Sequence, residues 1–81
     1  MDVNIEFSDA AFKHGISESA IRRAIGNFIY DDTLPNDKKL LLGFDGKAHL
    51  LEVVYNVIDE ETIKIFHAMK CRKEYLALLD D

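Results

Sequence analysis

The chain has 81 residues, is 48% hydrophobic and 31% charged, and carries 10 Lys and Arg against 15 Asp and Glu, a net charge of −5. This length suits one domain, residues 1–81, that buries roughly 60% of its surface on folding. The single cysteine, Cys71, excludes an internal disulfide framework and a cysteine-cluster zinc site. No apolar run approaches the roughly 20 residues of a membrane span, and the acidic N-terminus is unlike a signal peptide. We therefore expect a soluble, cytoplasmic protein.

The first third of the chain predicts a short extended segment followed by two helical pieces. Residues 3–7 alternate apolar and polar side chains, as a strand or an extended arm does. Ser8 is placed to cap a brief helical turn, which Gly15 is expected to end in a left-handed conformation. Ser17 is expected to cap the next helix, whose apolar residues follow a helical spacing and end near Phe28.

The rest of the chain predicts strands and a helical tail. Residues 31–37 are rich in turn formers, and three apolar runs joined by short turns follow them. Strands are expected at residues 38–44, 48–58 and 62–68. Residues 70–79 predict a short helix. The predicted fold class is α+β: two N-terminal helical pieces packed on an antiparallel β-meander of three to four strands, with a short C-terminal helix.

The strand period of two divides the longest predicted strand into two faces. The apolar set expected to pack on the amphipathic helix is Leu51, Val53, Tyr55 and Val57. The other face is expected to turn Glu52 and Asn56 toward water or a ligand. In the last predicted strand, the same period places His67 on one face with Ile65.

Polar residues suited to RNA cleavage without a metal gather after the last predicted strand. Such cleavage needs groups that remove a proton from the 2′-hydroxyl, stabilise the phosphorane and protonate the 5′-oxygen, and imidazole, guanidinium, ammonium and phenol groups can do this. The residues are His67, Lys70, Arg72, Lys73, Glu74 and Tyr75. A second basic patch is Lys13-His14. The alternative interpretation is structural, namely a strand-to-helix junction that carries solvated charge.

No metal or cofactor site is predicted. The three histidines lie on three different predicted elements, and none has a helical i, i+4 partner. The glycines at 43 and 46 are explained by a hairpin turn rather than by a phosphate-binding loop.

The segment Lys13-His14-Gly15-Ile16-Ser17, followed by a helix, resembles the KHG(I/L)S start of the BrnT-type toxins of bacterial type II toxin–antitoxin systems. The runs LLEVVY at 50–55 and IKIFHAMKCRKEY at 63–75 are similar to that family's later strands and basic tail, so the resemblance covers residues 12–79. It implies a RelE-like fold and a metal-independent endoribonuclease that blocks translation. It also implies a small DNA-binding antitoxin as the partner.

The resemblance and the chemistry together give the candidate site. The expected catalytic residues are His67, Arg72, His14 and Lys13, and the expected substrate-binding residues are Lys70, Lys73 and Tyr75. Toxins of this class are typically basic, so the net charge of −5 predicts weak binding of the RNA substrate. The rival hypothesis is a non-catalytic protein-binding module of the same fold that binds an antitoxin-like partner through apolar residues of the open sheet face, and homo-oligomerisation is left open. Those residues are Leu50, Val54, Ile58 and Phe66.

Overall fold

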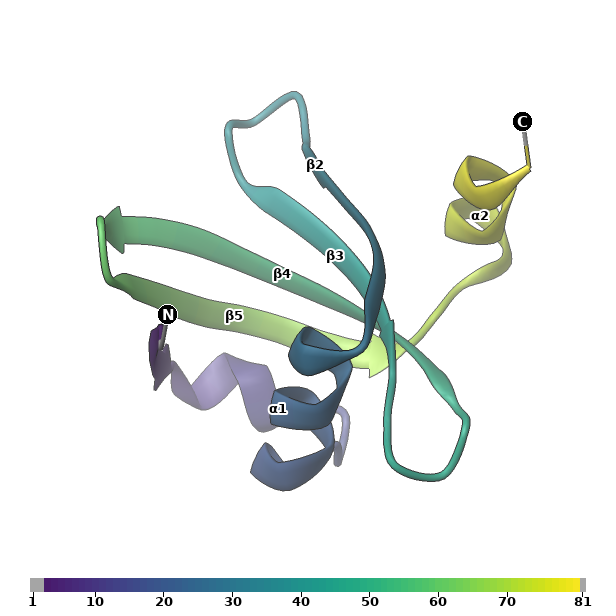
Figure 1. The fold of residues 1–81 in the computed structure, drawn as a ribbon, viewed down its shortest axis with the longest axis horizontal. Helices are drawn as coiled ribbons and strands as arrows, with labels where there is room; N and C mark the ends of the chain where they lie inside the picture. The colour runs from purple at the N-terminus through teal and green to yellow at the C-terminus, as the bar shows by residue number, and fades with distance from the viewer. Residues whose placement is uncertain (1–2, 81) are drawn as a thin grey trace.

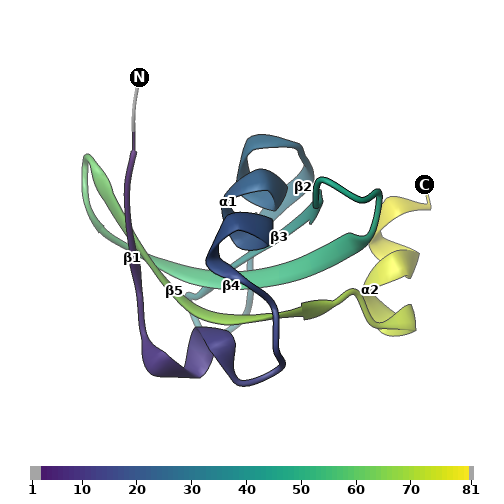
Figure 2. The same cartoon turned by 90° about the horizontal axis from the view of Figure 1, so that it is seen from below.

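The computed structural model describes residues 3–80, and its five strands form one sheet in the order β1-β5-β4-β3-β2. Figure 1 shows β2 to β5, and Figure 2 shows β1 next to β5. The strands are β1 (Asn4–Phe7), β2 (Phe28–Thr33), β3 (Lys39–Phe44), β4 (Leu50–Asp59) and β5 (Thr62–Lys70). The helices are the 3₁₀ turn η1 (Asp9–Phe12), α1 (Glu18–Gly26), the short α2 (Lys73–Leu76) and the 3₁₀ turn η2 (Ala77–Leu79).

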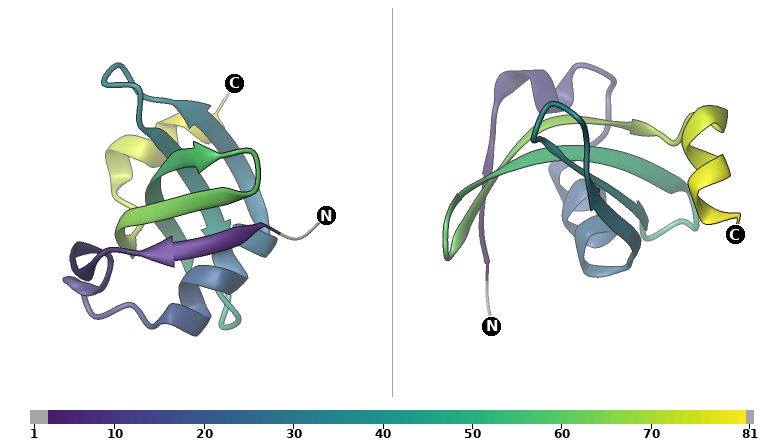
Figure 3. Two further views of the ribbon diagram at one scale, coloured as in Figure 1. Left: turned by 90° about the vertical axis from the view of Figure 1, so that its left-hand side faces the viewer. Right: turned by 90° about the horizontal axis from the view of Figure 1, so that it is seen from above.

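The structure is α+β, but the predicted architecture is wrong in its arrangement. The described chain enters the fold through strand β1, so η1 and α1 lie between β1 and β2 and are not N-terminal. The sheet has five strands rather than three to four, and it is mixed rather than antiparallel, because β1 pairs with β5 in parallel. Figure 3 shows β1 alongside β5. The extended segment at 4–7 joins the sheet because β5 offers it an unpaired edge, which local patterning does not reveal.

Strand β2 is the element that the sequence analysis missed. Residues 28–33 were expected to finish a helix and enter a turn, but α1 ends at Gly26 and β2 pairs antiparallel with β3. The side chain of Asp31, expected in a loop, instead accepts a hydrogen bond of 2.9 Å from the hydroxyl of Tyr55. Pairing with β3 satisfies the backbone of residues 31–33, so tertiary context overrides the turn propensity of the two aspartates.

The main core lies between α1 and one face of β3, β4 and β5. Its buried members include Ile21 and Ala24 of α1 together with Leu41, Leu51, Val53, Tyr55, Ile65 and Ala68. The predicted inward face of β4 is thus confirmed for its first three members, but Val57 is 59% exposed because α1 does not extend over it. Gly43 permits this packing, since a Cβ there would collide with the carbonyl oxygen of Ala24.

A β-bulge at Phe66 changes which side chains of β5 face the core. Val54 pairs with His67 and Tyr55 pairs with Ile65, so Phe66 is an extra residue in β5. Beyond the bulge the alternation is reversed. His67 therefore lies on the face opposite Ile65, and Ala68, which is fully buried, enters the core in its place. The prediction that His67 shares a face with Ile65 is wrong for this reason.

The segment 13–17 carries the chain from one side of β5 to the other. Figures 2 and 3 show η1 and α1 on either side of this strand. As expected, Gly15 has a positive φ of 79°, and the side chain of Ser17 caps α1 by accepting from the backbone N–H of Ala20 at 3.1 Å. Ser8 precedes η1 as expected but makes no capping hydrogen bond. Within residues 3–80, no helix has the length and apolar character needed to cross a membrane.

Candidate functional site

The site is organised around Glu52, a carboxylate buried on the face of β4 that points away from α1. Its side chain is 0% exposed. It accepts hydrogen bonds from the backbone N–H of Arg72 at 3.0 Å, from Arg72 Nη2 at 2.8 Å and from His67 Nε2 at 2.9 Å. The expectation that Glu52 meets water or a ligand is therefore wrong. Two residues that were predicted to do chemistry cover it instead.

These contacts keep Glu52 ionised despite its burial. Burial alone would raise the pKa of Glu52, but the hydrogen bonds from Arg72 and His67 and the charge of Arg72 outweigh it, so the pKa lies below its ordinary value. The same hydrogen bond raises the pKa of Arg72. Glu52 and Arg72 thus form an ion pair, with the carboxylate buried and the arginine partly exposed, that fixes the guanidinium after the end of β5.

Glu52 also determines which nitrogen of His67 carries a proton. A carboxylate only accepts hydrogen bonds, so Nε2 of His67 must be the donor. In the neutral ring this leaves Nδ1 without a proton and able to act as a base. The His67 side chain is 26% exposed, so solvent or a ligand can reach the ring.

A second imidazole lies next to the first. The ring of His14, which is exposed, packs edge-on against His67 with 5.2 Å between the centroids. His14 lies in the segment 13–17 as it passes β5, whereas His67 follows the bulge. Residues 53 positions apart in the sequence therefore form one pair of rings, an arrangement suited to moving two protons.

Arg72 extends the site toward α2. Its Nε and Nη2 atoms donate to Glu52, while among the described residues Nη1 makes no hydrogen bond. The guanidinium lies 5.0 Å from the ring centre of Tyr75, and its Nη2 is 3.5 Å from the Tyr75 hydroxyl. Arg72 thus retains the two N–H groups of Nη1 for a bound anion and is held between a carboxylate and an aromatic ring.

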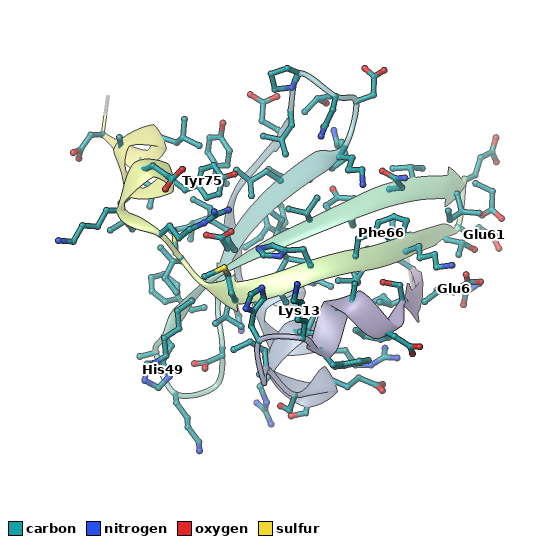
Figure 4. All side chains as sticks on the ribbon, turned by 180° about the vertical axis from the view of Figure 1, so that it is seen from behind. Glu6, Lys13, His49, Glu61, Phe66 and Tyr75 are labelled. Carbon is teal, nitrogen blue, oxygen red and sulfur yellow. The ribbon has the colours of Figure 1, made fainter. Side chains whose placement is uncertain are left out.

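The structure brings four of the seven predicted site residues together and separates others. His14, His67, Arg72 and Tyr75 form the site. Lys13, next to His14 in the chain, lies at the end of η1 beside β5 (Figure 4). The third histidine, His49, lies on the β3–β4 loop and well away from Tyr75 in the same view. Lys70 pairs with Leu51, so it lies on the α1 side of the sheet. Lys73 is exposed in the first turn of α2, and among residues 3–80 it makes no ion pair.

The sequence analysis did not include Glu52 in the candidate site, although the sequence contains a signal for its burial beside a cation. A single acidic residue inside the apolar run LLEVVY is costly to bury unless a cation pairs with it, and the cations of residues 70–73 were available. Cys71 lies beside the site and is half-buried. Burial, together with the charge of Glu52, raises the pKa of its thiol above the ordinary value in spite of the nearby charge of Arg72.

Among the described residues, no group of three His, Cys, Asp or Glu side chains could hold a metal ion. Comparison with known proteins adds no identification, since no family model, no curated protein and no solved structure matches this chain.

Proposed function

We propose that the chain is a metal-independent endoribonuclease of the toxin type, a translation inhibitor that acts in the cytoplasm. The observation that carries the proposal is the pair of imidazoles, His14 and His67, 5.2 Å apart beside an arginine that retains a free donor. The resemblance of the segments around these residues to BrnT-type toxins gives the same reaction class.

In the proposed reaction, Nδ1 of His67 removes the proton from the ribose 2′-hydroxyl. The 2′-oxygen then attacks the adjacent phosphorus, and the bond from phosphorus to the 5′-oxygen breaks. His14, protonated, supplies a proton to the departing 5′-oxygen. The products are a 2′,3′-cyclic phosphate and a 5′-hydroxyl end, and each imidazole ends in the protonation state in which the other began.

The remaining residues stabilise the charge that develops on phosphorus. In this scheme Nη1 of Arg72 donates to a phosphorane oxygen, since Nε and Nη2 are engaged by Glu52, while Lys13 adds positive charge from the neighbouring segment. Tyr75, stacked on Arg72, offers a ring face for a base. Glu52 contacts no substrate in this scheme, since it is covered by its partners, and we assign it the role of a positioning residue for His67 and Arg72.

The test is cleavage of a defined RNA by the purified chain in the presence of EDTA. His67→Ala or His14→Ala should lower the rate by roughly 10²- to 10⁴-fold, the usual contribution of one general acid or base. Glu60→Ala, in the turn between β4 and β5, is the matched control and should leave the rate unchanged. The proposal fails if the wild-type chain leaves RNA intact, or if both histidine variants cleave as fast as the wild type.

The biological counterpart is growth arrest. Expression of the chain alone should stop growth and translation, and co-expression of the proposed partner, a small DNA-binding antitoxin, should restore both. His67→Ala should allow growth without the partner, because it removes one of the two imidazoles that the reaction needs.

A second candidate is a non-catalytic module that binds an antitoxin-like protein. It is favoured by the helical tail, where no residue of α2 or η2 is buried and Leu76, Leu78 and Leu79 are 37–41% exposed. Of the open-face residues first considered for this role, Ile58 is 52% exposed, while Leu50, Val54 and Phe66 are half-buried. This module predicts tight binding that His67→Ala leaves intact and that Leu76→Asp weakens, without any RNA cleavage.

A further inference from the structure

A cavity of about 590 Å³ opens on the α1 side of the sheet, between the start of α1 and the β3–β4 loop. Three cationic side chains and one imidazole line it, namely Arg23, Lys47, Lys70 and His49. None of them takes part in the site around Glu52, and only Lys70 was predicted to bind substrate. Lys70 therefore lies in a separate cavity, on the side of β5 opposite the site around Glu52.

The charge of this cavity is positive although the chain as a whole is acidic. Arg23, Lys47 and Lys70 are exposed, and among residues 3–80 no carboxylate lies within ion-pair distance of any of them. The carboxylate that lines the cavity, Asp45, accepts from the backbone N–H groups of Lys47 at 2.8 Å and of His49 at 2.9 Å. Its other oxygen lies 3.1 Å from His49 Nδ1, and its side chain is 11% exposed. The carboxylate of Asp45 is thus hydrogen-bonded within the β3–β4 loop, whereas the three cations are exposed to solvent.

Gly46 places Arg23 against this loop. A Cβ at position 46 would lie 2.8 Å from Cδ and 3.2 Å from Nε of Arg23, so the arginine side chain occupies the space that a larger residue would need. The N-terminus of α1, beginning after Ser17, opens on the same cavity and adds the positive end of a helix dipole. Three cations and this dipole converge on one volume, which is the electrostatic footprint of an anion site.

We propose that this cavity binds a phosphate group of the same RNA strand that the His67 site cleaves, an inference that rests on the proposed function. The segment 13–17 connects the two places directly, since His14 contacts His67 and Ser17 lines the cavity. At the end of β5, Lys70 lines the cavity and Arg72 lies in the cleavage site, with one residue between them. A single strand that crosses the edge of β5 can place consecutive phosphates on both sides.

The test measures binding of a hexanucleotide RNA in which every ribose carries a 2′-O-methyl group, so that cleavage is blocked. The variant Arg23→Gln/Lys47→Gln should weaken binding at least tenfold and reduce the salt dependence, log K against log salt, by about 0.7 for each phosphate that the variant no longer neutralises. The control Arg22→Gln/Lys39→Gln removes the same two residue types outside the cavity, where Arg22 pairs with Glu18 and Lys39 bonds to Thr33. It should bind within twofold of the wild type.

A third variant changes geometry without changing charge. Gly46→Ala displaces the Arg23 side chain and should weaken binding severalfold while retaining all cations. The inference is overturned if the wild-type chain does not bind the hexanucleotide, or if the cavity variant binds like its control. Cleavage of unmodified RNA is measured separately. Binding that depends on Arg23 and Lys47 without cleavage would overturn the proposed function alone, and cleavage with cavity-independent binding would overturn this inference alone.

Discussion

Strand β4 buries side chains on both of its faces, and the two faces are stabilised by different chemistry. Toward α1 it presents Leu51, Val53 and Tyr55 to an almost wholly apolar core. On the other face Glu52 is equally buried, but what covers it is a guanidinium and an imidazole. The apolar face depends on close packing, whereas the polar face depends on every partner being present, because an unpaired buried carboxylate is costly.

The largest expected effect comes from the apolar face. Gly43→Ala places a Cβ against the carbonyl oxygen of Ala24, so α1 must move away from β3. Unfolding by urea should show a loss of about 3 kcal/mol or more in the free energy of unfolding. Gly26→Ala is the control, because a Cβ there meets nothing within 4 Å, and it should stabilise the chain by about 0.5–1 kcal/mol. Equal effects of the two substitutions would contradict the close approach of α1.

The next largest effect comes from the polar face. Arg72→Ala leaves Glu52 without its cation and should lower the free energy of unfolding by about 2–3 kcal/mol, less than for a fully enclosed pair because water then reaches the carboxylate. Arg22→Ala breaks an exposed ion pair with Glu18 and should cost about 0.5 kcal/mol or less. If the two arginine substitutions cost the same, Glu52 is not held as described.

A pH titration separates Glu52 from the other acids. Its pKa is lower in the folded chain than the ordinary value of 4.5, so its ionised form stabilises the fold above that value. This contribution is lost as the pH falls through the folded-state pKa. The free energy of unfolding should therefore fall more steeply below pH 4.5 in the wild type than in Glu52→Gln. Parallel curves for the two proteins would contradict the assignment.

The smallest effect on the free energy of unfolding is expected at the hydrogen bond between Tyr55, on the apolar face of β4, and Asp31 of β2. The hydroxyl of Tyr55 donates to both carboxylate oxygens of Asp31 at 2.9 Å, and burial with this neighbouring charge raises the pKa of Tyr55 well above its ordinary value. Tyr55→Phe should cost about 1 kcal/mol. Asp31→Asn, which keeps an acceptor, should cost less, and the reverse order would argue against this bond.

The same contrast between faces explains how far the sequence could predict the structure. Hydrophobic periodicity predicts those elements whose position is set by burial of apolar side chains. It therefore predicted α1, β3, β4 and β5, and the inward residues Leu51, Val53 and Tyr55. Strand β2 was missed because its register depends on β3 rather than on its own turn-prone composition. Parallel pairing of β1 was missed because it joins segments that are distant in the sequence.

The candidate site, like the fold, could be predicted from the sequence only in part. The residue types of His14, His67, Arg72 and Tyr75 indicated their chemistry, and the segment 13–17, β5 and the start of α2 bring them together. The bulge at Phe66 has no distinct sequence signal, yet it decides that His67 meets Glu52 rather than the core. Glu52 was expected to meet water or a ligand because alternation predicts which face a side chain is on, but does not predict whether that face is covered.

The pairing of β1 with β5 also has a consequence for synthesis of the chain. Asn4 cannot pair with its partner until Thr62 has been synthesised, and His14 cannot contact His67 until that residue has been added. Neither the sheet edge nor the site can therefore be completed while the intervening residues are being made. At about 5–20 residues per second, the interval from residue 4 to residue 62 is roughly 3–12 s. A nascent chain on the ribosome therefore carries only one of the two imidazoles, His14, until His67 has been added.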